Sequence, residues 1–232
     1  MEITSTIERY LDGIIADEFH RYKSWDNCYQ AFHVDKMTEN HILQLAFYLA
    51  SWGMYRGSSG LLQKNHLIHK GAVEILFHEE SLKLKCNQDN EVNKENINEI
   101  LVLKGKLAAH YENIYFTKGN NIRKSISPTN TLISKVMLGT LSCIPAYDRY
   151  FIDGLKAMKM KHTTFDINSI NELFGFIDSN TTDIKDAQNL IYTKTGNHYP
   201  LMKIMDMFFW QVGYDKELKE KSKKIKTNLL GL

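Results

Sequence analysis

Apolar residues recur along the chain at intervals of three and four positions, which is the spacing of an amphipathic α-helix. The first predicted helix covers residues 3–19. Thr38 is a suitable N-cap for a second helix, which Gly53 ends. Further helices are predicted over about residues 66–78 and 100–115. The pattern therefore indicates a chain that is helical nearly throughout.

The three prolines sharpen the prediction in the second half of the chain. A proline is well tolerated at the first position of a helix, because its missing N–H would have no partner there. Pro128, Pro145 and Pro200 each precede a stretch with helical periodicity. The first two predict consecutive helices joined by a tight junction at about residues 142–144. Asp148 then lies in the first turn of the second of these helices.

Alternating apolar and polar strands with turn dipeptides are absent from the sequence, so an all-α fold is expected. The polar segments 83–98 and 117–127 are typical of connectors. We expect residues 1–232 to form a single compact multi-helix globule. Two lobes within it would be connected by crossings near 83–98 and 117–127.

Composition restricts the class of protein only broadly. The 232 residues are 43% hydrophobic and 24% charged, as in ordinary globular proteins. No apolar run approaches the ~20 residues of a membrane span, and the acidic, amphipathic N-terminus does not resemble a targeting signal. We therefore expect a cytoplasmic protein with no membrane partner. A net charge of +2 neither requires nor excludes a nucleic-acid partner, and the sequence gives no indication of oligomeric state.

Metal and cofactor motifs are weak or absent. The three cysteines are far apart and form no CxxC pair, which argues against a disulfide scaffold or a zinc site. His66 and His69 lie three residues apart, but no carboxylate pattern accompanies them. No Walker, dinucleotide-binding, HExxH or GxSxG motif is present. We expect no metal and no cofactor.

Asp148 is the candidate of greatest interest, and two interpretations are open. A carboxylate in the first turn of a helix stabilises that helix by about 0.3–1 kcal/mol, and local pattern alone favours this role. Alternatively, the carboxylate is held at the mouth of a cleft. Tyr147, Arg149 and Tyr150 flank it, and aromatic rings can stack on an unpaired base.

Lys135 lies in the preceding apolar helix. Its ammonium either reaches solvent, which is the favoured expectation, or is partly desolvated, which would favour an amine nucleophile. The stretch SWGMYRGSSG contributes Trp52 and Arg56, and its glycines and arginine suit either a phosphate-binding site or a packed corner between two helices. The basic and aromatic segment 20–25 suits a nucleotide but is favoured as an exposed connection between helices.

The segment VMLGTLSCIPAYDRYF (residues 136–151) resembles the helix-hairpin-helix DNA glycosylase superfamily. An apolar helix, a turn and a helix opening with an aspartate correspond in order. The resemblance implies that Asp148 assists departure of the base, and that two helical lobes enclose a cleft for it. The family lysine would fall near Leu132, one helical turn from Lys135. Ser127, Thr129 and Asn130 stand where the family binds a phosphate through a Gly-x-Gly turn, and no iron–sulfur cysteines are present.

The expected function is that of a DNA N-glycosylase that flips and excises a damaged or modified base, in repair or in defence against phage. Asp148 and Lys135 are the expected catalytic residues. The expected substrate-binding residues are Trp52, Arg56, Ser127, Thr129, Asn130, Tyr147, Arg149 and Tyr150. The alternatives are a non-catalytic helical protein that binds a partner through aromatic side chains, and a hydrolase of another kind.

Overall fold

The computed structural model describes residues 2–34, 36–56, 59–118 and 122–229. The fold is mainly helical, with one two-stranded sheet, so the predicted helical class is confirmed. The α-helices are α1 (Ile3–Ile15), α2 (Lys23–Ala31), α3 (Glu39–Ser51), α4 (Lys70–Leu76), α5 (Glu79–Leu82), α6 (Ile97–Glu112), α7 (Asn130–Thr140), α8 (Arg149–Ala157), α9 (Ile167–Ser179), α10 (Thr181–Thr195) and α11 (Leu201–Leu229). Short 3-10 helices are η1 (Gly60–Gln63), η2 (His66–His69) and η3 (Lys94–Asn96).

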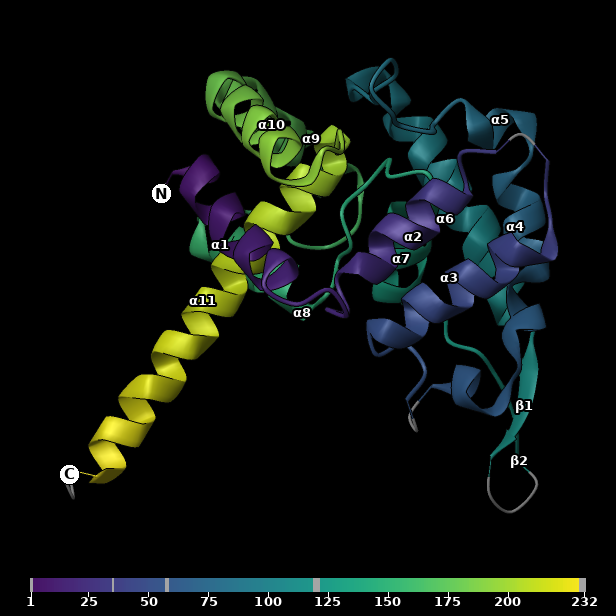
Figure 1. Ribbon diagram of the computed structural model, residues 1–232. Coiled ribbons are helices and arrows are strands. Elements are labelled where there is room, and N and C mark those ends of the chain that lie inside the picture. The colour runs from purple at the N-terminus through teal and green to yellow at the C-terminus, as the bar shows by residue number, and fades with distance from the viewer. Residues whose placement is uncertain (1, 35, 57–58, 119–121, 230–232) are drawn as a thin grey trace.

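Two groups of helices are visible in Figure 1, with α1 and α8–α11 on one side and α2–α7 on the other. The buried apolar side chains of both groups form one continuous core. Helix α7 is buried from Leu132 to Thr140, and its Leu138 carbonyl accepts a hydrogen bond of 3.0 Å from Trp25 Nε1. The chain crosses between the groups after α1 and again after α7, so the crossing after α7 carries Asp148.

Side chains rather than prolines determine where two of these helices begin. Helix α7 starts at Asn130, since Thr129 Oγ1 accepts a hydrogen bond from the Leu132 N–H (3.2 Å). Helix α8 starts at Arg149 and not near Pro145, because Asp148 is its N-cap. The expectation that Pro128 and Pro145 occupy first helical positions is wrong. Pro200 does lie directly before α11, and Thr38 directly before α3.

The polar segment 117–127 contains most of a β-hairpin, which sequence periodicity did not reveal. Strand β1 (Tyr115–Lys118) pairs antiparallel with β2 (Ile122–Ser125). Such short strands, with all four residues of β2 exposed, do not have the alternating pattern by which strands are recognised. The Ile126 N–H donates to the Ile114 carbonyl (2.9 Å) and extends the pairing toward the body of the protein.

Helices α8 and α11 approach each other at two glycines. A Cβ atom on Gly154 would overlap the backbone of Phe209, and one on Gly213 would overlap the backbone of Tyr150. Each helix therefore provides a glycine where the other's main chain passes. This contact places Trp210 of α11 beside Tyr150 of α8.

In Figure 1 the second half of α11 extends away from the other helices. Residues Lys216–Lys223 of this part are mainly charged and exposed. Within the described part of the chain, no helix combines the length and apolar character needed to cross a membrane.

The segment 83–98 is attached to the start of α11 by Glu91. Its Oε1 accepts a hydrogen bond from the Leu201 N–H (2.8 Å), whereas Oε2 is buried without a hydrogen-bond partner. Burial raises the pKa of this carboxyl to about 7. The folded protein therefore favours the protonated form over a range of pH in which the unfolded chain is already ionised.

The glycine contact generates a stability prediction. Gly154→Ala should lower the free energy of unfolding by about 1–3 kcal/mol or more, because the new methyl group must displace main-chain atoms of α11. The matched control is Gly175→Ala in α9, where a Cβ meets nothing within 4 Å. It should stabilise the protein by about 0.5–1 kcal/mol, since alanine is the better helix former. Urea denaturation measures both changes, and a stable Gly154→Ala protein would contradict the described packing.

Glu91 generates a prediction of pH dependence. The pKa of Glu91 is higher in the folded than in the unfolded state, so its contribution to stability should increase as pH falls from above 7 toward the ordinary pKa of 4.5. Glu91→Gln should remove that contribution and be the more stable protein at pH 8. The difference should diminish at pH 5, by at most about 1.4 kcal/mol per pH unit. Thermal denaturation at both pH values checks this, and equal differences at the two would argue against it.

Candidate functional site

The loop between α7 and α8 is held by three side-chain hydrogen bonds from α7 and α11. Thr131 Oγ1 donates to the Tyr147 carbonyl (2.9 Å), and the Tyr147 N–H donates to Ser134 Oγ (2.8 Å). From α11, Asp206 Oδ1 accepts a hydrogen bond from the Ala146 N–H (3.0 Å). Because side chains on two helices hold consecutive peptide units, the loop presents residue 148 in one orientation.

Asp148 performs two structural tasks at once. Its Oδ1 accepts a hydrogen bond from the Phe151 N–H (3.1 Å) as the N-cap of α8, and its Oδ2 accepts one from Lys135 Nζ (2.8 Å). The two side chains are only 14% and 3% exposed. The expectation that Lys135 reaches solvent is wrong, because Asp148 provides a counter-charge inside the protein.

The ion pair lies at a depression of about 330 Å³, which we call the Asp148 pocket. Its lining residues come from the α1–α2 connection, the end of α3, α7, α8 and α11. They are Arg21, Trp52, Gly53, Met54, Arg56, Thr131, Lys135, Asp148, Arg149, Tyr150 and Trp210. The pocket therefore combines one carboxylate with four cationic side chains and three aromatic rings.

A stack of aromatic rings ends at this pocket. Tyr10 stacks on Tyr22 (4.7 Å between ring centroids), and Tyr22 stacks on Trp52 (5.1 Å). Trp210 packs edge-on against Trp52 at 6.0 Å. Lys135 Nζ lies 4.7 Å from the centroid of Trp52, and Trp52 Nε1 is buried without a hydrogen-bond partner. The pocket thus has a rigid aromatic wall beside the ion pair.

The arginines of the pocket differ in how they are held. The Arg21 guanidinium lies 4.9 Å from the centroid of Trp52. Arg149 lies 4.4 Å from the Tyr150 centroid and forms an ion pair of 2.8 Å with Glu217. Arg56 is exposed at the border of the pocket. Their charge exceeds that of Asp148, so the pocket attracts anions.

Six of the predicted site residues meet in this pocket: Trp52, Arg56, Lys135, Asp148, Arg149 and Tyr150. Tyr147 does not line it. Its side chain points into the core, stacks on Phe165 (5.0 Å) and shares a hydrogen bond of 2.9 Å with Ser169. The neighbouring residues 147 and 148 are on opposite sides of the chain, which sequence spacing did not indicate.

Ser127 and Thr129 lie nearby but in a separate depression of about 250 Å³, which we call the hairpin depression. It adjoins the Asp148 pocket, because Met54 and Arg56 line both. Asn130 is the first residue of α7 and lines neither. The expected phosphate-binding residues are thus next to the pocket rather than within it.

Arg21 and Trp210 line the pocket although sequence reasoning did not assign them to a site. Arg21 belongs to the basic and aromatic segment 20–25, so the signal was present but favoured an exposed connection. Trp210 lies in an apolar stretch of α11 that carries no site motif, and it is only 2% exposed. It lines the pocket although nearly all of its surface is buried.

A second buried ion pair lies in α11 and helps to hold the loop that carries Asp148. Lys203 Nζ lies 3.3 Å from Asp206 Oδ2, and both residues are buried in α11. Burial raises the pKa of Asp206, while the Lys203 cation acts in the opposite direction. Because Asp206 also holds the Ala146 N–H, this pair connects α11 to the loop that presents Asp148.

The two histidines considered as metal ligands have other partners. His66 Nε2 lies 3.1 Å from Glu39 Oε1. His69 is buried between the hydroxyls of Tyr55 and Tyr111, each 2.7 Å from a ring nitrogen, and burial lowers its pKa to about 3. No group of three or more His, Cys, Asp or Glu side chains suited to a metal occurs in the described residues.

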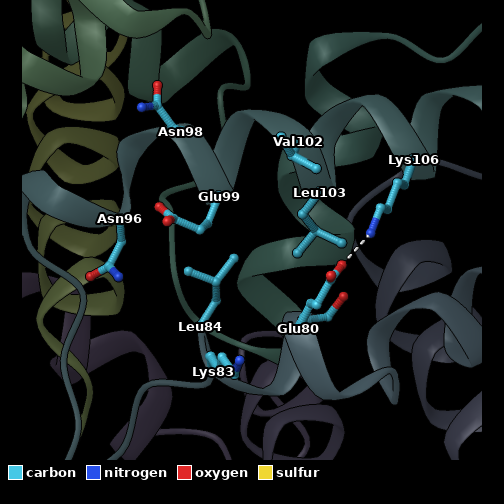
Figure 2. Close-up of a pocket in the computed structure, with 10 residues that line it drawn as sticks. Glu80, Lys83, Leu84, Asn96, Asn98, Glu99, Val102, Leu103 and Lys106 are labelled. Atoms are coloured by element: carbon cyan, nitrogen blue, oxygen red, sulfur yellow. Dashed lines mark hydrogen bonds and ion pairs between the residues drawn. The ribbon is translucent and has the colours of Figure 1, made fainter.

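A different depression, of about 410 Å³, lies between α5 and α6. Figure 2 shows Glu80 and Lys106 extended toward each other at one end of it, where they form an ion pair of 2.8 Å. The described residues that line it include no aromatic side chain and none of the predicted site residues. Its chemistry therefore gives no reason to prefer it over the Asp148 pocket.

Comparisons of the chain with protein-family models, with curated proteins and with solved structures found no match.

Proposed function

We propose that the Asp148 pocket receives a base extruded from DNA and that the protein is a DNA N-glycosylase. The observation that carries this proposal is the 2.8 Å ion pair between Lys135 and Asp148 beside an aromatic wall. The pair was expected from sequence to be catalytic, and folding brings its members together although 13 positions separate them in the chain.

The surroundings of the pair suit a nucleotide. The pocket volume of about 330 Å³ lies at the small end of the ~300–1,000 Å³ typical of ligand sites. A base would stack on Trp52 or Tyr150 in place of the guanidinium that lies over each ring, and Arg21 and Arg149 would then hold the adjoining phosphates. An enzyme that acts on a base must take it out of the duplex, and this requires such a pocket.

Asp148 supplies the chemistry in this proposal. As the bond between base and sugar breaks, positive charge develops on the sugar, and a carboxylate at fixed distance stabilises that charge. Water then adds its hydroxyl group to the sugar, and its proton leaves with the base. The cap hydrogen bond from Phe151 fixes one carboxylate oxygen, so Asp148 need not reorganise during the reaction.

Lys135 orients and balances Asp148. Its Nζ donates directly to Oδ2, so the lysine is engaged as an ion-pair partner rather than directed at a sugar carbon. The geometry thus favours hydrolysis assisted by Asp148 over attack by the lysine amine.

The same geometry supports a second candidate, a non-catalytic protein that binds its partner at this pocket. Both oxygens of Asp148 already have structural partners, which a purely architectural aspartate would also have. Both candidate functions predict that a partner binds at the Asp148 pocket, but only the glycosylase predicts that a bond is cleaved there.

Asp148→Asn separates them. Asparagine is also a good N-cap, so α8 should remain intact while the negative charge is lost. Because the buried Lys135 loses its counter-charge, stability should fall by about 3 kcal/mol, and excision is compared at a temperature where denaturation shows both proteins to be folded. Excision from duplexes that carry damaged or phage-type modified bases should fall about 100-fold or more. The measurement is the appearance of alkali-labile strand breaks.

Asp166→Asn is the matched control. Asp166 caps α9 through hydrogen bonds from Asn168 and Ser169 and does not line the Asp148 pocket. This variant should excise as the unmodified protein does. Bound duplex with no strand breaks on any substrate would support the binding protein, and breaks that persist undiminished in Asp148→Asn would refute the assigned chemistry.

A double-mutant cycle tests the ion pair itself. Lys135→Met leaves Asp148 without its cation and should cost about 3 kcal/mol of stability, because a mostly buried charge loses its partner. Lys135→Met combined with Asp148→Asn should recover part of that stability but no excision activity. Chemical denaturation and the strand-break assay give the two readouts. Additive stability losses would show that the two side chains are not coupled.

A further inference from the structure

Two segments of the chain contain no acidic residue. Residues 40–73 and 113–147 together carry seven lysines and arginines but no aspartate or glutamate, in a chain with 29 basic and 27 acidic residues. Folding brings parts of these segments together. Arg56, Ser59 and Gly60 of the first line the hairpin depression with Phe116, Lys124 and Ser127 of the second. The hairpin depression is thus lined by two cations, Arg56 and Lys124, and by no carboxylate among the described residues. We call the exposed part of the two segments the basic face.

The β1–β2 hairpin extends from this face. In Figure 1 it projects past the ends of α3, α4 and α7, the helices on its side of the molecule. Phe116 anchors it by packing on Gly60, where a Cβ atom would collide with the ring. All four residues of β2 are exposed, so they contribute little to the core. Because these side chains are exposed, core packing does not explain why two of them are basic. An isolated two-stranded ribbon is also only marginally stable, so the hairpin adds little to the stability of the fold.

Basic side chains occupy both faces of the hairpin. Lys124 of β2 lies opposite Phe116 of β1 in the strand pairing, and it lines the hairpin depression together with Arg56. Arg123 pairs with Thr117, and its guanidinium lies 4.1 Å from the centroid of Tyr115, which is 45% exposed. The hairpin therefore presents one cation toward the depression and one cation on an exposed aromatic ring.

We propose that the hairpin and the hairpin depression form a track for the backbone of duplex DNA that leads away from the Asp148 pocket. The proposal rests on the proposed function for the identity of the partner. Lys124 and Arg56 would contact phosphates at the depression, where Ser125 and Ser127 add hydroxyl donors. Arg123, supported by Tyr115, would contact the backbone farther along the duplex.

The continuity of the two depressions makes this geometry suitable for one duplex. Arg56 lines both, and among the described residues that line either depression Asp148 is the one acidic side chain. A strand whose extruded base enters the Asp148 pocket must continue on at least one side of it. An acidic protein is the competing partner, and it would be favoured by a chain that does not bind duplex DNA.

The test compares the full chain with Arg123→Ala/Lys124→Ala, using a fluorescent DNA duplex free of lesions. Each lost phosphate contact should weaken binding and make the plot of log affinity against log salt shallower by about 0.9. Affinity at low salt should fall about tenfold or more. Because both side chains are exposed, the thermal midpoint should hardly change. The control, Lys161→Ala/Lys185→Ala, removes the same charge from exposed positions elsewhere and should bind as the unmodified chain does.

The outcomes distinguish this proposal from the proposed function. Weaker binding in the hairpin variant alone supports the track, whether or not the chain excises any base. Equal losses in both double variants, or a loss in neither, would overturn the track even if Asp148-dependent excision is observed. Failure of the unmodified chain to bind the duplex at low salt would also overturn it and would favour an acidic protein as the partner of the basic face.

Discussion

The ion pair between Lys135 and Asp148 is the interaction on which the arrangement of the proposed site depends. Two nearly buried charges are costly to remove from water, and they persist only where each has its partner in good geometry. Asp148 meets this condition because one of its oxygens accepts a hydrogen bond from Lys135 and the other accepts one from the first turn of α8. The pair therefore couples the end of one crossing segment to the central helix α7, so that a change in either displaces the pocket.

The close approach of α8 and α11 supports that pair from the opposite side. Gly154 and Gly213 let the two main chains come together, and Asp206 of α11 then reaches the loop before Asp148. The same contact brings Trp210 to the pocket, where it packs on Trp52. Stability and site geometry thus have a common origin in the packing of these helices.

Charge is distributed unevenly over the fold. The net charge of the whole chain is +2, but residues 40–73 and 113–147, which form the basic face, contain no aspartate or glutamate. This face includes the border of the Asp148 pocket and the hairpin. The acidic residues are concentrated in the remaining segments, where several form ion pairs on the surface, such as Glu80 with Lys106 and Glu8 with Lys194.

The sequence by itself determined the helical class, the N-cap at Thr38 and the position of Asp148 at the start of a helix, because periodicity and capping chemistry depend on neighbours in the chain. Only the tertiary structure decided that Lys135 is buried against Asp148, that Tyr147 points into the core, and that Arg21 and Trp210 reach the pocket. These outcomes depend on contacts between residues far apart in the chain, and a local sequence pattern does not specify which distant side chains come into contact.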